Sequence, residues 1–215
     1  ISLTSIPCKI MEHVIYSHVI NFLDSNSFFH TCQHGFRKGL SCETQLALFL
    51  HDIHTNLDTN FQTDAIFLDY AKAFDTVPHN KLIQKLSGLN LDPNVLRWIK
   101  YFLANRSQFV HVNNESSEPL EVTSGVPQGC VLGPLLFLIY INDLPLTVSC
   151  KIRMFADDCV IYHTITNVSD QLTLQHDLNN IQEWCDNSLL KLNPNKCKVL
   201  IHSPRKSFPI PIPNH

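Results

Sequence analysis

The sequence lacks an excess of basic residues. It holds 16 lysines and arginines against 19 aspartates and glutamates, which gives a formal net charge of −3. Proteins that bind nucleic-acid phosphates usually carry a basic surface, so this balance argues mildly against nucleic-acid binding. The argument is weak, because a metal-dependent enzyme also needs carboxylates of its own.

The chain also lacks a long apolar run. Its most apolar stretch, residues 131–141, includes Gly133 and Pro134 and is too short to span a membrane. The first residues carry no charged segment ahead of an apolar one, so we expect no signal peptide. These absences predict a soluble protein without membrane contact, located inside the cell in the cytoplasm or the nucleus.

Metal-binding spacings of cysteine and histidine are absent too. No pair among the eight cysteines has C-x-x-C spacing, and the twelve histidines form no H-E-x-x-H cluster. A chain of 215 residues with 44% hydrophobic content can bury a core without disulfides. We therefore predict free thiols in a reducing compartment and no zinc site.

Hydrophobic periodicity predicts alternating helices and antiparallel strands. Helices are expected from Ser41 to Leu57, from Pro78 to Leu86, from Pro93 to Phe102, from Pro134 to about Asn142, and from a Ser169 cap to Cys185; strands are expected at 65–68, 109–112, 120–122, 152–155, 159–162 and 197–201. This order indicates an α+β domain in which one sheet is faced by helices.

Two adjacent carboxylates stand between two predicted strands, in Phe155-Ala156-Asp157-Asp158. Like charges held side by side repel each other, so the pair suggests a function such as cation binding. The alternative is structural, since aspartate is favoured in hairpin turns. The residues alone leave both interpretations open.

A third carboxylate, Asp69, ends the strand predicted at 65–68. The end of a rigid strand holds a side chain accurately enough for a metal ligand, although Asp69 could simply end the strand. If Asp69 and Asp157 come from neighbouring strands, they can share two Mg²⁺ ions that act on an in-line phosphoryl displacement. Their carboxylates would then lie within roughly 4–7 Å of each other.

A loop rich in glycine and proline, Ser124 through Gly129, precedes the apolar helix. Its glycines let the backbone approach a ligand closely, and Gln128 can donate or accept a hydrogen bond without adding charge. A plain connecting loop would account for the glycines but less well for the glutamine.

Together these blocks resemble the reverse transcriptase domain of non-LTR (LINE-type) retrotransposons. Any single block is weakly specific, but chance does not explain their common order over nearly the whole chain. In chain order the matching blocks are Ile1-Ser2-Leu3 with Lys9-Ile10-Met11-Glu12, Gln33-His34-Gly35-Phe36-Arg37, Phe67 through Asp75, Gly125 through Gly129, Phe155 through Asp158, and Leu190 through Lys196.

The resemblance implies two Mg²⁺ ions as cofactors, with Mn²⁺ as a possible substitute. Asp69 and Asp157 would be the principal ligands, Asp158 a supporting ligand, and Tyr70 would contribute its backbone carbonyl. Lys196 matches a lysine that is a candidate proton donor to the leaving pyrophosphate. The alternative for Lys196 is an exposed residue without a catalytic role.

The resemblance also implies residues that contact the substrates. Phe74 would be a steric gate whose ring excludes a ribose 2′-hydroxyl and so selects deoxynucleotides. The remaining assignments are Gln128, Pro127 and Gly129 at the incoming nucleotide and template base, Ala156 and Phe155 beside the primer end, and Arg37 and Lys38 at phosphate.

The fold implied is a right-hand polymerase with interleaved fingers and palm and an antiparallel sheet with helices on one face. We expect fingers at about 1–62 and 87–115, palm at about 63–86 and 116–206, and a connector at 207–215 toward a thumb outside this stretch. The partners would be an RNA template, a DNA primer and deoxynucleoside triphosphates. The family usually has an Arg-Pro pair before Ile1, and its absence here puts the activity of this stretch alone in question.

Two other functions compete with this one. The chain could be an inactive remnant that keeps only the fold or nucleic-acid binding, against which the intact Asp69, Asp157 and Gln128 speak. It could also be a polymerase that makes RNA, against which Phe74 speaks, because a smaller residue or an aspartate would suit a 2′-hydroxyl better.

Overall fold

The computed structural model describes residues 4–104 and 106–204, so the Ile1-Ser2-Leu3 block and the connector expected at 207–215 lie outside the described residues. The chain forms two compact units, each assembled from segments far apart in sequence. The helical unit runs up to Phe28 and from Lys72 to Tyr140, and the sheet unit comprises Phe29–Ala71 and the chain from Ile141 onward. The fingers and palm predicted from the sequence have other boundaries, and that division stays a prediction.

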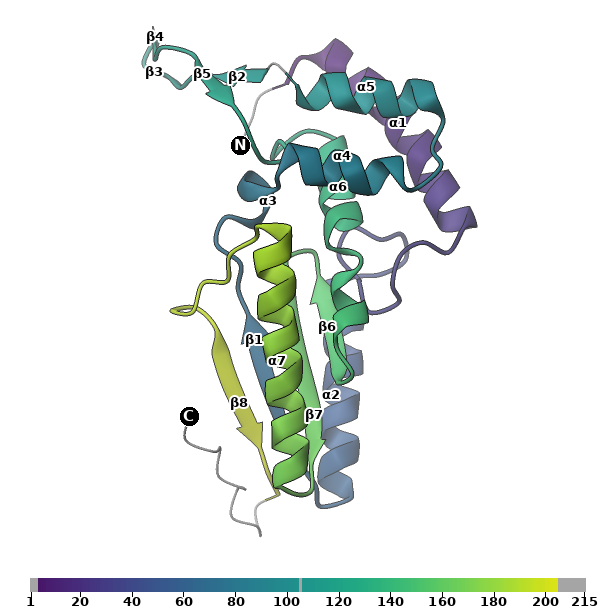
Figure 1. Cartoon of the computed structure of the whole chain (residues 1–215), viewed down its shortest axis with the longest axis vertical. Helices are drawn as coiled ribbons and strands as arrows, with labels where there is room; N and C mark the ends of the chain where they lie inside the picture. Colours follow the sequence, from purple (N-terminus) through teal and green to yellow (C-terminus); the bar gives the residue numbers. More distant parts are fainter. Residues whose placement is uncertain (1–3, 105, 205–215) are drawn as a thin grey trace. The chain divides into compact units, whose positions relative to one another are not determined.

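The sheet unit contains a four-stranded antiparallel sheet with the strand order β6-β7-β1-β8 (Figure 1). The strands are β1 (Gln62–Leu68), β6 (Lys151–Phe155), β7 (Asp158–Ile165) and β8 (Lys198–His202). Strand β1 therefore lies inside the sheet, although its two partners come much later in the chain. The strands predicted at 65–68, 152–155, 159–162 and 197–201 are confirmed, and β1 begins earlier than predicted.

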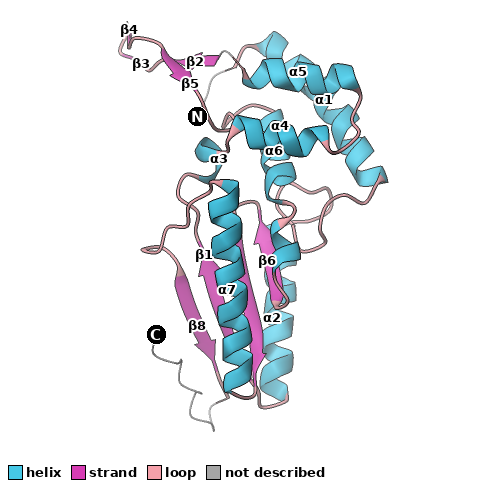
Figure 2. Ribbon diagram, viewed as in Figure 1, coloured by secondary structure: helices cyan, strands magenta, loops and turns pink. Residues whose placement is uncertain are grey.

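Helices α2 (Cys42–Asp58) and α7 (Val168–Ser188) cover opposite faces of this sheet (Figure 2). On one face, Phe49 and Ile53 of α2 pack with Ala65, Val160 and Tyr162. On the other face, alternate residues of β1 and residues of α7 line a groove between the helix and the sheet. The α+β class is confirmed, with helices on two faces of the sheet where one was expected. A short 3₁₀ turn, η1 (Leu144–Thr147), precedes β6.

The starts of both covering helices are fixed by capping boxes. The Ser41 hydroxyl accepts a hydrogen bond from the Thr44 amide and the Thr44 hydroxyl accepts one from the Ser41 amide, as predicted for α2. Helix α7 is capped by Asn167, so the prediction of a Ser169 cap was wrong. Asparagine caps as well as serine does: the Asn167 side chain accepts a hydrogen bond from the Ser169 amide, and the Asn167 amide donates one to the Asp170 carboxylate.

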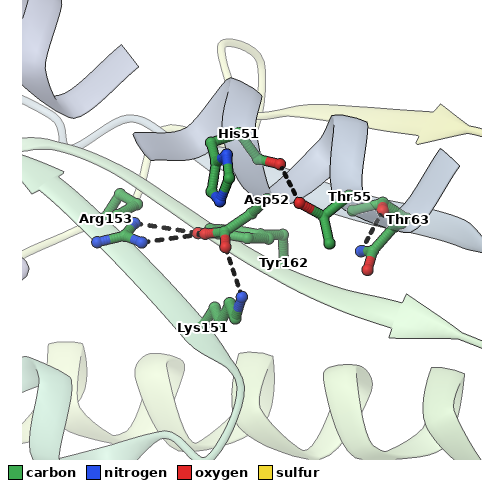
Figure 3. Close-up of polar contacts among 8 residues, drawn as sticks. His51, Asp52, Thr55, Thr63, Lys151, Arg153 and Tyr162 are labelled. Atoms are coloured by element: carbon green, nitrogen blue, oxygen red, sulfur yellow. Dashed lines mark hydrogen bonds and ion pairs between the residues drawn. The ribbon is translucent and has the colours of Figure 1, made fainter. Parts of the chain in front are cut away.

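A polar network ties α2 to the sheet (Figure 3). The Asp52 carboxylate accepts hydrogen bonds from Lys151 Nζ at 2.6 Å, Arg153 Nη2 at 3.0 Å and Tyr162 Oη at 2.5 Å. Burial opposes ionisation of Asp52, but these three donors outweigh it and lower the pKa of the carboxyl to about 2. The network therefore holds the helix against β6 and β7 as long as Asp52 is ionised.

The helical unit holds α1 (Ile6–Ser25), α3 (Ala73–Thr76), α4 (His79–Ser87), α5 (Pro93–Leu103) and most of α6 (Leu132–Ile141). The helices predicted from Pro78, Pro93 and Pro134 are confirmed, whereas α1 had not been predicted. Within the described residues no helix is both long and apolar enough to cross a membrane.

A β-ribbon follows α5, as the sequence predicted, but the strand predicted at 109–112 is present only at 111–112, and it does not pair with the strand at 120–122. Strand β2 (Arg106–Gln108) pairs with β5 (Leu120–Val122), and β3 (His111–Val112) pairs with β4 (Glu115–Ser116). The turn at its tip has positive φ at Asn113 and Asn114, a conformation that asparagine tolerates better than most residues.

A buried glutamate connects α1 to the start of α6. Glu12 is 0% exposed, and its Oε2 accepts hydrogen bonds from the amides of Val131 at 2.7 Å and Leu132 at 3.0 Å. A carboxylate at a helix N-terminus satisfies amides that have no partner within the helix. Glu12 thus fixes the point at which the loop 124–131 gives way to α6.

Candidate active site

The Asp157-Asp158 pair lies where β6 turns into β7. Phe155 pairs with Asp158, so Ala156 and Asp157 form the tip of a tight hairpin. Ala156 has a φ of +56° and is 5% exposed, while Asp157 does not share the positive φ. A positive φ at only the first central residue is typical of a type II′ turn, in which glycine is usual. Asp157 is half-buried, and Asp158 is exposed.

Asp69 lies at the same end of the neighbouring strand. It directly follows Leu68, whose partner across the sheet is Cys159 of β7. Its carbonyl accepts a hydrogen bond from the Asn193 amide at 2.7 Å, and the Ala71 amide donates to the Lys191 carbonyl at 2.8 Å. These two bonds form an antiparallel bridge between Tyr70 and Leu192. The backbone that carries Asp69 is therefore held on both sides.

The carboxylates at this end of the sheet are electrostatically coupled. The pKa of Asp157 is raised, first by burial and then by the negative charges of Asp158 and Asp69. In addition, Oδ2 of Asp69 is buried and accepts no hydrogen bond. A buried carboxylate oxygen that accepts no hydrogen bond is costly unless a cation compensates it, and the cation found near this one is Nζ of Lys196 at 3.8 Å.

This donor set fits Mg²⁺. Within residues 4–104 and 106–204, His, Cys, Asp and Glu side chains form no cluster of three or more that could enclose a metal by themselves. Mg²⁺ does not need such a cluster, because it is usually held by one or two carboxylates together with water and substrate phosphates. Asp69 and Asp157 supply two carboxylates at the same end of neighbouring strands, which meets that requirement.

Lys196 and Tyr70, both expected near Asp69, are found beside it. Nζ of Lys196 lies 3.8 Å from Oδ2 of Asp69, and the lysine side chain is 68% exposed. The ring of Tyr70 is buried at 5% exposure, and neither hydrogen bond of the Tyr70–Leu192 bridge uses the Tyr70 carbonyl. That carbonyl is therefore not occupied by the bridge.

In the helical unit, the loop 124–129 folds against α3. The Val126 amide donates to the Phe74 carbonyl at 2.8 Å, and Nε2 of Gln128 donates to Oδ1 of Asp75 at 3.2 Å. Gly125 has a φ of +87°, and a Cβ added there would lie 2.6 Å from the Asp75 carbonyl oxygen. Glycine is thus required for this approach.

Phe74 and Gln128 were both predicted to contact the incoming nucleotide. The contact between the loop 124–129 and α3 brings them near each other. The ring of Phe74 stacks on the buried ring of Phe137, with a centroid distance of 4.2 Å and an interplanar angle of 19°. Phe74 is only half-buried and Gln128 is exposed. In the same loop Pro127 is buried and Gly129 is exposed.

The other residues predicted to contact phosphate or primer, Arg37, Lys38 and Phe155, belong to the sheet unit. The Arg37 guanidinium lies over the ring of Phe29 at 4.0 Å, so part of its binding capacity is used within the protein. Lys38 is exposed and Phe155 is half-buried. Their predicted contacts with phosphate and primer stay predictions.

Gln33 is a site residue to which the sequence assigned no role. Its side chain is buried and makes hydrogen bonds with both the amide and the carbonyl of Ala156 at the hairpin tip. It occurs in the matched block Gln33-His34-Gly35-Phe36-Arg37, and this was the only signal available from the sequence.

Known proteins resemble this chain in sequence and in fold. The family described as "Reverse transcriptase (RNA-dependent DNA polymerase)" matches residues 1–208. The chain belongs to the reverse transcriptase family. This confirms the resemblance to non-LTR retrotransposon domains, and curated relatives from such elements agree with it.

A "Probable RNA-directed DNA polymerase from transposon BS" of Drosophila melanogaster is 31% identical over 205 residues, covering 91% of this chain and 22% of that protein. The "RNA-directed DNA polymerase from mobile element jockey" of the same fly is 28% identical over 198 residues, covering 88% and 22%. This reverse transcriptase domain thus spans less than a quarter of these curated relatives.

Solved telomerase structures share the fold. One from Candida tropicalis, in complex with a fragment of telomeric RNA, superposes with a TM-score of 0.62 at 12% identity, covering 88% of this chain and 33% of that one. One from Candida albicans gives a TM-score of 0.58 at 15% identity, covering 94% and 34%. At these identities the likeness shows the polymerase fold alone and confirms the predicted fold class.

Proposed function

We propose that this domain catalyses RNA-templated DNA synthesis by adding deoxynucleotides to a primer end. The observation that carries the proposal is the pairing of Asp69 and Asp157 at adjacent strand ends. Burial and neighbouring charge raise the pKa of Asp157, and a buried oxygen of Asp69 accepts no hydrogen bond. Family membership supports the reaction class, and the Asp69–Asp157 pair supports the proposed location of the reaction.

Asp69 and Asp157 would hold two Mg²⁺ ions, with Asp158 and the Tyr70 carbonyl as supporting ligands and Mn²⁺ as a substitute. When bound, the ions would supply charge stabilisation to the reacting oxygens and the triphosphate. The chain's own part is positioning, because phosphoryl transfer leaves little covalent work to the protein. The fixed backbone on both sides of Asp69 suits that task.

The helical unit would contribute selection of the nucleotide. Phe74 stacks on Phe137 and is still half-exposed, as a steric gate requires. Gln128, oriented by Asp75, together with Pro127 and Gly129, would contact the incoming nucleotide or template base. An RNA template, a DNA primer and deoxynucleoside triphosphates are therefore the proposed partners.

The remaining site assignments complete this proposal. Lys196 would donate a proton to the leaving pyrophosphate, and Ala156 and Phe155 would lie beside the primer end. Arg37 and Lys38 would contact phosphate. The eight free cysteines and the retrotransposon relatives support a location in the cytoplasm or the nucleus.

Extension of a DNA primer on an RNA template tests the proposal. With Mg²⁺ or Mn²⁺ present, we expect extension by the unaltered chain and a loss of at least about a hundredfold in Asp157→Asn, which keeps the side-chain volume but removes a ligand charge. Asp58→Asn, at the exposed end of α2, is the matched control and should extend normally. Extension by Asp157→Asn at the control's rate would refute the assignment. If the unaltered, folded chain does not extend primers with either metal, the inactive-remnant alternative is supported instead.

A further inference from the structure

The turn that carries Asp157 has an unfavourable backbone conformation at its tip. Ala156 has a φ of +56°, in the left-handed region that non-glycine residues enter at a cost of about 1 kcal/mol or more. Glycine would adopt this conformation freely. Some interaction outside the hairpin must therefore stabilise it.

Gln33 provides that interaction. Its Oε1 accepts hydrogen bonds from the Ala156 amide at 2.8 Å and the Gly35 amide at 2.8 Å, and its Nε2 donates to the Ala156 carbonyl at 3.2 Å. Both backbone groups of the strained residue are thus bound by one side chain. Because both amides must donate, the orientation of the carboxamide is unambiguous. Gln33 is 4% exposed, so water does not compete for these bonds.

The chain around Gln33 is itself fixed to the hairpin. The His34 amide donates to the Met154 carbonyl at 2.9 Å, and the Met154 amide donates to the Cys32 carbonyl at 2.9 Å. These bonds add the segment 32–34 in parallel to the outer edge of β6. At Gly35 an added Cβ would lie 2.2 Å from the Ala156 amide nitrogen, so the two backbones are in direct contact.

We propose that Gln33 is a positioning residue, which holds Ala156 in its left-handed conformation and thereby sets the direction of the Asp157 carboxylate. Asp157 directly follows Ala156, so rotation about the Ala156 backbone would move its carboxylate relative to Asp69. Glutamate could not replace Gln33, since it would lose the donor to the Ala156 carbonyl and bring a further negative charge beside Asp157 and Asp158. The effect on metal binding rests on the proposed function, whereas the hold on Ala156 does not.

Amide hydrogen exchange of the ¹⁵N-alanine-labelled chain tests the hold directly. In Gln33→Met, which keeps the volume and removes the hydrogen bonds, we expect the Ala156 amide to exchange about five- to tenfold faster. The matched control is Gln62→Met, which changes another buried glutamine of the sheet unit, at the end of β1 away from Asp69. The control should lower the melting temperature without selective exchange at Ala156. Unchanged exchange at Ala156 in Gln33→Met would overturn the proposal.

Mn²⁺ binding, followed by the electron paramagnetic resonance signal of the free ion, tests the consequence without turnover. We expect about tenfold weaker binding in Gln33→Met, no change in Gln62→Met, and recovery in Gln33→Met/Ala156→Gly. Recovery separates positioning from general support of the core, because glycine needs no help at positive φ. A loss that glycine does not restore, or an equal loss in the control, would contradict the proposal.

Two outcomes separate this proposal from the proposed function. If the unaltered chain does not bind Mn²⁺, the metal site fails, and Gln33 is judged by Ala156 exchange alone, with the outcomes given above. If Gln33→Met does not fold, the same change is made in Ala156→Gly. Continued failure to fold there would show that Gln33 supports the core and would overturn the positioning role.

Discussion

Nζ of Lys196 lies 3.8 Å from Oδ2 of Asp69, a separation that suits an ion pair but exceeds a hydrogen bond. The lysine is mostly exposed, so the pair adds at most about 1 kcal/mol to stability. Its position beside a proposed metal ligand agrees with the role in the reaction proposed above.

Replacement of Lys196 by methionine should therefore slow primer extension without unfolding the domain. We expect kcat to fall by about a hundredfold if Lys196 donates a proton, with a melting temperature within about 1 °C of the unaltered chain. Lys198→Met, at the exposed start of β8, is the matched control. Equal extension rates in the two variants would assign Lys196 to the solvated surface.

Truncation of Phe74 should change the choice of sugar. Without the ring, a 2′-hydroxyl no longer meets a clash, so Phe74→Ala should admit ribonucleotides while affecting deoxynucleotides less. Some loss of stability is expected from the lost stacking on Phe137, below the roughly 3–5 kcal/mol typical of a fully buried phenylalanine. Incorporation of both nucleotide types and thermal unfolding are measured together.

The control for that experiment is Phe102→Ala, which removes another half-buried ring that stacks on Trp98 in the same unit. It should lower the melting temperature and leave sugar choice unchanged. If Phe74→Ala instead loses both activities equally, in step with its melting temperature, Phe74 belongs to the core and not to a gate.

The Asp52 network predicts a defined acid sensitivity. The folded-state pKa of Asp52 is about 2 against a usual 3.8, so its stabilisation is fully present above about pH 4 and is lost as the pH falls toward 2. Asp52→Asn should lower the free energy of unfolding by roughly 2 kcal/mol at neutral pH, with the difference shrinking through that window. Denaturant unfolding at a series of pH values measures it. A difference that stays constant from pH 7 to pH 2 would contradict the assigned pKa.

Most helices and strands with an apolar period were predictable from the sequence, although α1 and the cap of α7 were missed, and the buried polar part of β1 was not predictable. The apolar half of β1 was recognised, but Gln62, Thr63 and Asp64 were not assigned to the strand, although they belong to it and all three are buried. Asp64 tolerates burial because Gln62 and Gln171 donate hydrogen bonds to it. Gln171 lies 107 positions from Asp64, so a local sequence pattern does not contain this half of the compensation.

The residues of the candidate site also differ in whether the sequence could identify them. Asp69, Asp157 and Lys196 could be identified because each stands at the end of a strand or in a recognisable block. Gln33 could not be assigned a role, because its partner Ala156 is 123 positions away and offers only backbone atoms. A contact to backbone atoms does not depend on the side chain of the contacted residue, so the sequence does not reveal it.

The interior position of β1 also constrains the order in which this domain can fold. Its neighbours β7 and β8 follow it by roughly 100 residues or more, so in a chain emerging from the ribosome β1 stays unpaired until those residues have been made. During that time α2, which directly precedes β1, is available to cover one of its faces. The strand that presents Asp69 therefore gains its sheet partners only after residues 72–140 have been made, and until then both of its edges are open to pairing with other strands.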